Sequence, residues 1–557
     1  MKQIESLLNT MQMTRANYLP IVGTFCRRVG LIETINRIVP NQMEVDVGTI
    51  IQGMVLDTLS GRSPLYRLAT FFRHQDTELL FGREVPWTAF NDTTVGRAMD
   101  AIFEAGTQKV FSEVAFQAAT KFPLDMHHVH FDTTSVSVWG DYDACGPHSK
   151  QLNITHGNSK DLRPDLKQFL IKMLCVNRNI PLLGGCEDGN ASDKSLNNTL
   201  LTRISRHMAR HGLKPGAFLY IADCTMVTED NLCTIGDNLF VTRLPFSYNE
   251  ACRVVSEAIA EGQWEEVGAL NATPATAKRP SARYRTTEKT VTLYDRQYRA
   301  VVVYSTAHDK RRLKRIDREI GKSEQMLLKT LADKTKREFF CRPDAEAAAS
   351  RLHESGTDLH RIEALVTTKL RYARGRPPKN RSRKVASVRY VIDAQIVERT
   401  ERIERKRDES GCFVLLTNVP REGDKAETGA ELLRAYKDQH GIERNFAFMK
   451  DPLIVNDLFL KKTERVEVLG TVILIALLIW NLIEHVLRQY VAEHNATLPG
   501  WDNKPTTRPT TFMMSTKFIG LQFVKMGRLR RLAQPLDDVQ RTYLAALNLS
   551  ERALVMP

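Results

Sequence analysis

The sequence predicts an α/β protein of several domains, in which a mixed sheet with flanking helices is interrupted by an inserted α+β domain. Residues 1–115 have apolar positions three and four apart, as helices do. From residue 116 the pattern changes to short apolar runs rich in β-branched residues, which favour strands. This strand pattern stops near residue 249, and the parent pattern resumes near residue 425. A chain of 557 residues is also too long for one ordinary core.

Individual elements follow from the local patterns. Helices are predicted at 47–61 and 63–82, with Gly61 and Gly82 as stop signals. The core is predicted to contain four apolar strands interrupted by an amphipathic helix, and a fifth strand after them: strands 126–140, 167–177 and 180–188, the helix 192–214, then strands 217–227 and 237–245. The insert is predicted to contain strands within 289–305, a charged helix at 310–334 and further strands at 387–397 and 412–420.

The composition limits which kinds of binding partner and which cellular compartment are expected. Hydrophobic content of 42% with 26% charged residues is typical of a soluble folded protein. A net charge of +14 indicates a polyanionic partner, of which nucleic acid is the commonest and a membrane surface the rival. The nine cysteines form no CxxC pair, so neither a zinc site nor a disulfide framework is indicated, and a reducing cytoplasm fits. The first residues lack a continuous apolar run, so no secretory signal is expected.

One apolar segment, residues 466–486, is nearly long enough to span a bilayer. Glu467 lies at its start, and Asn481 and Glu484 lie near its end. Polar groups at these positions favour a helix buried inside a large protein, and we predict a core helix with no membrane contact.

Asp132 is an acid in a segment, HFDTTSVSVWGD, that otherwise has the composition of a strand. We therefore place it near the end of a core strand. A buried carboxylate must be protonated, paired or bound to a cation, because desolvating it alone is costly. An aspartate that closes a turn with Thr133 and Thr134 is the alternative. A second acid, Asp223, ends the fourth apolar strand.

A helix is predicted from the capping box of Thr428 and Glu431 to Pro452. At about 100° per residue, four polar side chains share a stripe roughly 60° wide on it. The four are Tyr436, Gln439, Glu443 and Lys450. A stripe of this kind is either a solvated face or a functional site.

The spacing of these four residues resembles the signature of a subgroup of bacterial insertion-sequence transposases of the DDE type. That signature is Tyr, two residues, Arg, three residues, Glu, six residues, Lys. Gln439 stands where the pattern has Arg, so the phosphate contact expected there is weaker, neutral or supplied by Arg444. Asp132 followed by small hydroxyl residues, and the segments 157–168 and 187–193, also resemble this family, over roughly residues 20–490.

The resemblance implies an RNase H-like catalytic core. Asp132 and Asp223 would come from adjacent strands and Glu443 from a helix that packs near them. Three such carboxylates can hold two divalent ions about 3.5–4 Å apart for an in-line phosphoryl displacement. Oxygen-only ligands select Mg²⁺, which Mn²⁺ can replace. The strand histidines 127, 128 and 130 are alternative ligands, although such histidines also have structural roles.

Several basic segments are candidate DNA contacts. Residues 369–384 carry eight basic side chains and no acid, and Arg374-Gly-Arg376-Pro resembles the AT-hook core, which lies in a narrow minor groove. Lys379 belongs to the same segment. Plain phosphate binding or disorder is the alternative. Residues 504–531 are also basic. In related transposases an aromatic residue of the insert stacks on a flipped base, and Trp264 is the candidate here, with a core role as its alternative.

Together these patterns predict a cut-and-paste transposase that binds the inverted ends of an insertion sequence. It would cleave double-stranded DNA and join the 3′-OH ends to target DNA, as a homodimer on the bacterial nucleoid. The alternatives are a metal-dependent nuclease or resolvase without strand transfer, and a non-catalytic DNA-binding protein. The expected segments are a helical DNA-binding region (1–115), the core in two parts (116–248 and 425–495), the insert (249–424) and a basic C-terminal region (496–557).

Overall fold

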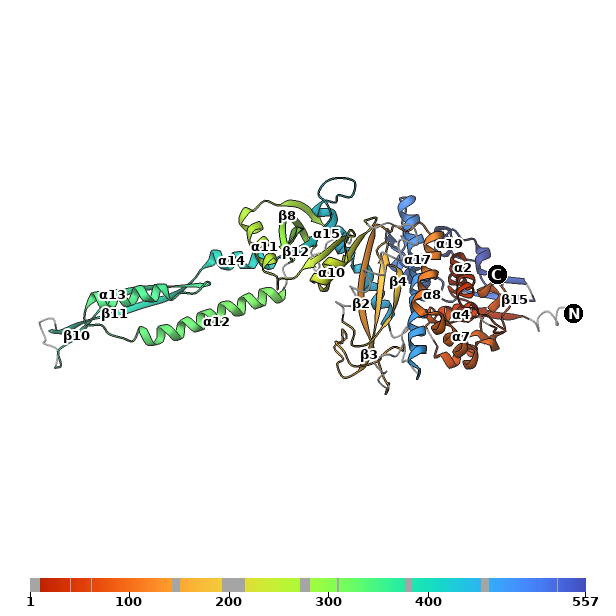
Figure 1. The fold of residues 1–557 in the computed structure, drawn as a ribbon, viewed down its shortest axis with the longest axis horizontal. Helices are drawn as coiled ribbons and strands as arrows, with labels where there is room; N and C mark the ends of the chain where they lie inside the picture. The colour runs from red at the N-terminus through yellow and green to blue at the C-terminus, as the bar shows by residue number, and fades with distance from the viewer. Residues whose placement is uncertain are drawn as a thin grey trace. The chain divides into compact units, whose positions relative to one another are not determined.

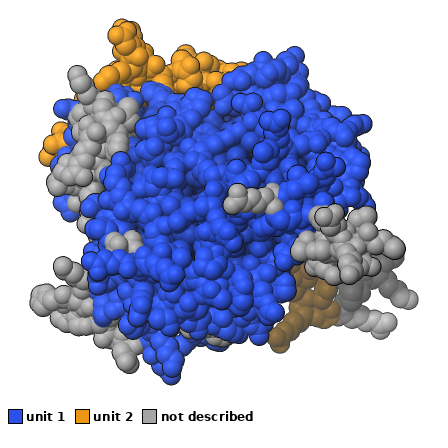
Figure 2. Space-filling view, turned by 90° about the vertical axis from the view of Figure 1, so that its right-hand side faces the viewer, with its two compact units in different colours: residues 1–242, 435–557 blue, residues 243–434 orange. Residues whose placement is uncertain are grey.

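The computed structural model describes residues 11–40, 42–61, 63–142, 151–192, 216–270, 281–307, 310–375, 383–451, 460–527 and 529–557. The chain divides into two units (Figures 1 and 2). The first unit contains residues 1–242 and 435–557, and the second contains residues 243–434. The second unit thus includes the whole predicted insert.

Helices dominate the start of the first unit, as the apolar spacing predicts. Gly82 ends the helix before it in a left-handed conformation, as its prediction as a stop signal requires. The predicted helix at 63–82 is split, because a turn separates its last two helical pieces. The helices are α2 (Leu19–Val29), α3 (Leu31–Ile38), α4 (Val47–Thr58), α5 (Leu68–Arg73), α6 (Thr77–Phe81), α7 (Asp92–Ala105) and α8 (Thr107–Lys121).

The C-terminal segment folds against these N-terminal helices. Strand β1 (Gln12–Arg15) pairs with β15 (Gln522–Met526), which pairs with β16 (Leu529–Leu532). Arg530 is buried and forms a two-pronged ion pair with Asp76, at 2.7 and 2.9 Å. Asp76 is the N-cap residue of α6, so this ion pair joins the C-terminal segment to the N-terminal helices. The remaining helices of this segment are α18 (Thr511–Lys517) and α19 (Asp538–Ala546).

A five-stranded arrangement forms the centre of the first unit, in the order β4-β3-β2-β5-β6. Antiparallel pairing joins β2 to β3 and β3 to β4, whereas β5 is parallel to both β2 and β6. The predicted strands are therefore present, and the predicted helix at 192–214 lies almost wholly outside the described residues. The bounds are β2 (His128–Val138), β3 (Lys167–Val176), β4 (Ile180–Glu187), β5 (Leu219–Ala222) and β6 (Leu239–Leu244), with α10 (Glu229–Thr234) before β6.

Helix α17 (Thr463–Glu493) packs on β4, α7 and α8. Its apolar segment is 89% buried within the protein, so the predicted core helix is confirmed. Among the described residues it is the one helix long and apolar enough to cross a membrane. A close approach explains one of its glycines: a Cβ at Gly470 would lie 2.4 Å from the sulfur of Cys186 on β4.

The second unit contains an antiparallel sheet in the order β12-β9-β8-β7. The predicted strand region 289–305 is a hairpin that turns at Tyr294 and Asp295, both of which have positive φ. The elements are β7 (Glu265–Ala269), β8 (Arg283–Leu293), β9 (Arg296–Ser305) and β12 (Cys412–Thr417), with helices α11 (Asn249–Glu261) and α14 (Thr400–Ser410).

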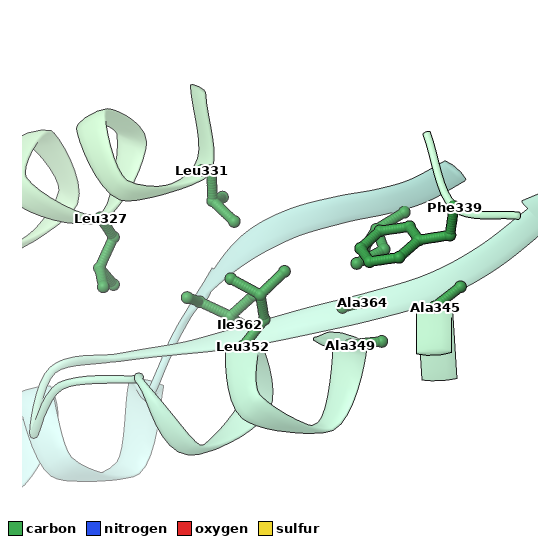
Figure 3. Packing of buried hydrophobic residues seen from close by; sticks show 9 residues of the cluster. Leu327, Leu331, Phe339, Ala345, Ala349, Leu352, Ile362 and Ala364 are labelled. Atoms are coloured by element: carbon green, nitrogen blue, oxygen red, sulfur yellow. The ribbon is translucent and has the colours of Figure 1, made fainter. Parts of the chain in front are cut away.

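A helical arm with a two-stranded ribbon completes the second unit. The predicted charged helix is α12 (Lys310–Lys334), followed by α13 (Arg342–Glu354), and the ribbon is formed by β10 (His360–Tyr372) and β11 (Val385–Glu398). Figure 3 shows side chains from both helices and β10 gathered in a small core. We call these buried residues the arm core: Leu327, Leu331, Phe339, Ala345, Ala349, Leu352, Ile362, Ala364 and Ile392.

Candidate active site

The sequence predicted Asp132 near the end of a strand, but it lies in the middle of β2. The pairing explains the difference: β3 accompanies β2 as far as Val138, whereas β5 pairs only with residues 128–130. On its β5 side Asp132 is beyond the paired residues, and its side chain keeps 25% of its surface exposed. The turn-closing alternative is wrong, because Thr133 and Thr134 also belong to the strand.

Asp223 follows β5 directly and caps a short 3-10 helix. Its side chain accepts hydrogen bonds from the backbone N–H and the hydroxyl of Thr225, at 3.1 and 2.5 Å. The β2–β5 register pairs His130 with Ile221, and Asp132 and Asp223 lie two residues further along each strand. Because these strands are parallel, the two acids leave the paired region at the same end.

The side chain of Tyr220 feels the charges of both Asp132 and Asp223. Its side chain is fully buried on β5, and burial raises the pKa of Tyr220 well above its usual value. The negative charges of Asp223 and Asp132 raise this pKa further. One phenol therefore lies within the electrostatic range of both carboxylates, which agrees with the register.

Glu443 lies on α16 (His440–Met449), which packs against β2. The amide nitrogen of Asn445 on this helix lies 3.4 Å from the sulfur of Met173 and 3.3 Å from that of Cys175. Met173 is the cross-strand partner of Asp132, and paired residues point to the same face of a sheet. Helix α16 thus covers the face that carries Asp132.

The carboxylate of Glu443 is more exposed than those of the two half-buried aspartates. Its side chain is 63% exposed and pairs with the ring nitrogen Nδ1 of His440 at 2.8 Å. Within the described ranges, no cluster of metal-ligating side chains contains Asp132, Asp223 or Glu443. By the strand register the two aspartates lie side by side where the paired region ends, and the glutamate lies on the helix that packs against β2.

The helix that was predicted as continuous is two helices. Its capping box is confirmed, because Thr428 and Glu431 exchange hydrogen bonds between side chain and backbone N–H, at 2.8 and 3.2 Å. Helix α15 (Gly429–Lys437) ends before Asp438, and α16 begins after Gln439. Tyr436 therefore lies on α15 and Glu443 on α16, with Gln439 and Lys450 as the cap residues of α16, so the prediction of a single continuous helix for the four residues is wrong.

Close packing accounts for this break. A Cβ at Gly441 would lie 2.2 Å from the carbonyl oxygen of Arg178, so the first turn of α16 is pressed against the β3–β4 turn. Only glycine allows this approach. The backbone before it forms shorter-range bonds, Gly441 N–H to Asp438 and Ile442 N–H to Gln439, which tighten the chain between the two helices.

Two residues that were not predicted as site residues connect β2 with α16. The ammonium of Lys160 lies 3.9 Å from Asp132 and donates to the backbone and side-chain oxygens of Thr133, both at 2.7 Å. The next residue, Asp161, accepts a bond from Lys450 at 2.5 Å. Both lie in the segment 157–168 that resembles the transposase family, and this was the signal that could have identified them.

That segment is anchored by the second family-like segment, 187–193. Gln168 donates to the carbonyl oxygen of Gly189 at 2.7 Å, and a Cβ at Gly157 would lie 2.0 Å from the same oxygen. The backbones of the two segments are therefore in direct contact. Of the second segment, residue 193 lies outside the described residues.

The remaining candidates differ in their environments. Gln439 and Tyr436 are half-buried, Arg444 is exposed, and Lys450 caps the C-terminus of α16 while paired with Asp161. Among the alternative ligands, His130 is buried, and burial followed by the charge of His128 lowers its pKa to about 4. His130 is therefore a neutral core residue at pH 7.

In the second unit, Trp264 is half-buried, with its ring edge against Tyr304 at 5.9 Å between centroids. The guanidinium of Arg285 lies over the Trp264 ring at 5.7 Å, so one face of the indole is occupied. Arg374 is exposed just beyond the end of β10. Arg376 and Lys379 lie outside the described residues.

The N-terminal helical region resembles a known protein domain. Residues 11–116 match a family model described as "Domain of unknown function (DUF4277)". The match covers the helices α2 to α7 and most of α8, and this domain occurs in transposase-like proteins. No curated protein matches the chain.

Proposed function

We propose that the chain is a DDE transposase with an RNase H-like core, which cleaves the ends of an insertion sequence and joins the 3′-OH ends to target DNA. The main support is the position of Asp132 and Asp223 at the same end of two paired parallel strands, below the helix that carries Glu443. Further support comes from the N-terminal match to a domain that occurs in transposase-like proteins.

The three carboxylates form a donor set that fits Mg²⁺, because all their ligand atoms are hard oxygens. When bound, two such ions, or Mn²⁺ in their place, would activate the attacking oxygen and stabilise the leaving oxygen. Asp132 and Asp223 would hold them from the sheet. Glu443 would be the third ligand, and it is exposed and pairs only with His440 among the partners described.

Other side chains would hold the DNA during this reaction. Lys450 contributes a positive charge at the end of α16 and Tyr436 a hydroxyl, and both would hold the phosphate next to the scissile bond. Lys450 is paired with Asp161 in the free protein, so DNA binding would exchange that partner for a phosphate. Lys160 is a fixed cation beside Asp132 and limits the repulsion between the acids.

The proposed reaction takes place on double-stranded DNA in the bacterial cytoplasm, with two copies of the chain on paired element ends. A net charge of +14 supports a polyanionic partner. The helical N-terminal region, the insert with Trp264 and Arg374, and the basic C-terminal region would all contact DNA.

The decisive experiment is cleavage of a labelled duplex carrying the inverted end found beside the gene, in Mg²⁺ and in Mn²⁺. Asp132→Asn and Asp223→Asn should each lower the cleavage rate by at least about 1000-fold without loss of DNA binding. Asp165→Asn is the matched control, because Asp165 is an exposed acid paired with Arg163. Near wild-type cleavage by either site variant would refute the assignment.

A second substrate separates the transposase from its rivals. Ends that are already cut and carry a free 3′-OH should be joined to a target plasmid. A nuclease or resolvase on the same core would cut intact ends and leave these substrates unjoined, and a non-catalytic DNA-binding protein would bind both without reaction.

A further inference from the structure

Four arginines from distant parts of the first unit gather beside the candidate active site. Arg178 lies in the β3–β4 turn, Arg444 on α16, Arg488 on α17, and Arg508 in the loop before α18. We call these four residues the arginine cluster. Since Arg444 follows Glu443 directly, the cluster begins next to the third candidate acid.

A buried asparagine network holds three of these elements together. The carbonyl oxygen of Asn179 accepts bonds from the amides of Asn445 and Asn481, each at 2.7 Å, and Asn481 also donates to Asn445 at 2.9 Å. Asn179 and Asn445 are the immediate neighbours of Arg178 and Arg444 in the sequence. The backbone positions of these two arginines are therefore set by the fold.

The loop that contains Arg508 is bound to Arg488 by a hydrogen bond. The Nε of Arg488 donates to the carbonyl oxygen of Pro509 at 3.2 Å, which places the loop containing Arg508 against α17. Burial lowers the pKa of Arg488, the charge of Glu484 raises it, and the charges of Arg444, Arg178 and Arg508 lower it further, as expected for like charges in proximity.

The cluster has fewer acids than it needs for neutrality. Arg488 pairs with Glu484 at 2.6 Å, and Arg178 lies 3.5 Å from Asp438. Within the part of the chain that the structure describes, Arg444 and Arg508 have no ion-pair partner, and both are exposed. Four guanidiniums with two carboxylates leave a surplus of positive charge, so the site is suited to a ligand with several closely spaced negative charges.

We propose that the arginine cluster binds successive phosphates of a DNA strand and directs it past Glu443. Guanidiniums pair with phosphate oxygens in a two-pronged geometry, and several in a row suit a sugar-phosphate backbone better than a single anion. The inference deepens the proposed function, because it takes DNA as the polyanion and the candidate acids as the place to which the strand is led.

The test removes the three exposed charges and leaves the Arg488–Glu484 pair intact. Binding of the full-length variant Arg178→Gln, Arg444→Gln, Arg508→Gln to a fluorescent random-sequence duplex is measured by anisotropy from 50 to 300 mM KCl. Each lost phosphate contact should lower the slope of log K against log salt by about 0.9, or about 2.7 for all three. At 150 mM KCl this corresponds to an affinity loss on the order of 100-fold.

Two further variants serve as controls. Lys121, Lys461 and Lys462 are exposed cations of the same unit outside the cluster and outside the segments proposed to contact DNA, and their joint replacement by Gln removes the same charge. This control should lower the slope of log K against log salt by less than the value for one phosphate contact, about 0.9. The corresponding Lys variant of the cluster should keep most of the slope, because phosphate binding needs the charge, and thermal melts should show all variants folded.

A slope equal to that of the wild type in the triple Gln variant, or an equal fall in the control, would overturn the proposal. So would a selective loss of binding to anionic vesicles with DNA binding unchanged. The outcome is separable from the test of catalysis: the same triple change in Asp132→Asn protein should still lower the slope, even if the chain proves not to cleave DNA.

Discussion

Strand β2 of the first unit and strand β10 of the second unit carry their charges in opposite environments. Eight of the eleven residues of β2 are buried, and Asp132 is one of the three that are only partly exposed. In β10 the first residues alternate between buried and exposed, and every residue from 367 to 372 is exposed. The charge on β2 lies half-buried in a strand whose other residues are mostly buried, whereas the charges on the end of β10 lie in solvent.

This difference predicts which property of the protein a substitution in each strand should change. A charged side chain in a packed sheet is held by many neighbours, so a substitution that keeps its shape, such as Asp132→Asn, should change the charge of the site and leave the packing in place. A basic side chain on an exposed ribbon is screened by salt and contributes little to folding. Glu338, for example, pairs with Lys369 and Arg371 at the surface of the arm. We therefore expect the chemistry to depend on the first unit and the second unit to contribute graded effects on binding only.

The largest effect is expected from Glu443→Gln. The substitution keeps the shape of the side chain but removes a negative charge, so cleavage should fall by at least about 1000-fold while DNA binding persists. The melting temperature should change little or rise. Glu431→Gln is the control: it weakens the capping box of α15 by roughly 1 kcal/mol and should leave cleavage nearly unchanged. If Glu443→Gln cuts normally, then Glu431 or Asp438 becomes the next candidate for the third acid.

The next largest effect is expected where the two ends of the chain meet. Arg530→Met leaves the buried Asp76 with Lys525, at 3.2 Å, as its one remaining ion-pair partner among the described residues, and should lower the free energy of unfolding in urea by about 3 kcal/mol at pH 7. Arg541→Ala breaks an exposed ion pair with Asp538 and should cost less than about 1 kcal/mol. Equal losses in the two variants would contradict the buried pair.

This effect should also depend on pH. Burial raises the pKa of Asp76, but the hydrogen bonds and charges of Arg530, Leu79 and Lys525 outweigh it, so the net pKa lies below the ordinary 3.8. A lowered folded pKa stabilises the protein above the unfolded value, and this contribution is lost as the pH falls through the folded pKa. The difference between wild type and Arg530→Met should therefore shrink below about pH 4.

A smaller and local effect is expected from Leu352→Ala in the arm core. The leucine is 1% exposed, and its truncation should cost about 2–3 kcal/mol, since one side of the arm is open and can relax. Hydrogen exchange should rise in residues 310–400 and stay unchanged in β2 and α17. Leu474→Ala on α17 is the matched comparison and should destabilise the first unit by more. Faster exchange in both units after Leu352→Ala would show that they unfold together.

The smallest effect is expected from the ribbon. Replacing Arg374 and Arg376 by Ala should weaken DNA binding by roughly tenfold and lower the salt slope by at most about 1.8. If these arginines lie in a minor groove, the loss should be greatest on A·T-rich ends. Titrations with A·T-rich and G·C-rich duplexes give the comparison, and a uniform loss would leave only phosphate contact.

Much of the secondary structure is determined locally and could be predicted. The strands of the core and the insert, the charged helix α12 and the capping box of α15 depend on residues that are close in the sequence. The core helix α17 was predictable because its apolar run carries polar residues at both ends. Two acids, Asp132 and Asp223, could be assigned to adjacent strands because a family resemblance supplied the strand order.

Other features depend on contacts between residues that are distant in the sequence, and only the tertiary structure decided them. The break between α15 and α16 follows from the contact of Gly441 with the β3–β4 turn, and the mid-strand position of Asp132 follows from the short pairing with β5. The pairing of β1 with β15 joins segments some 500 residues apart. Arg178 and Arg508 are ordinary surface arginines in the sequence, and their shared charge exists because an asparagine network and a packed loop bring them to one place.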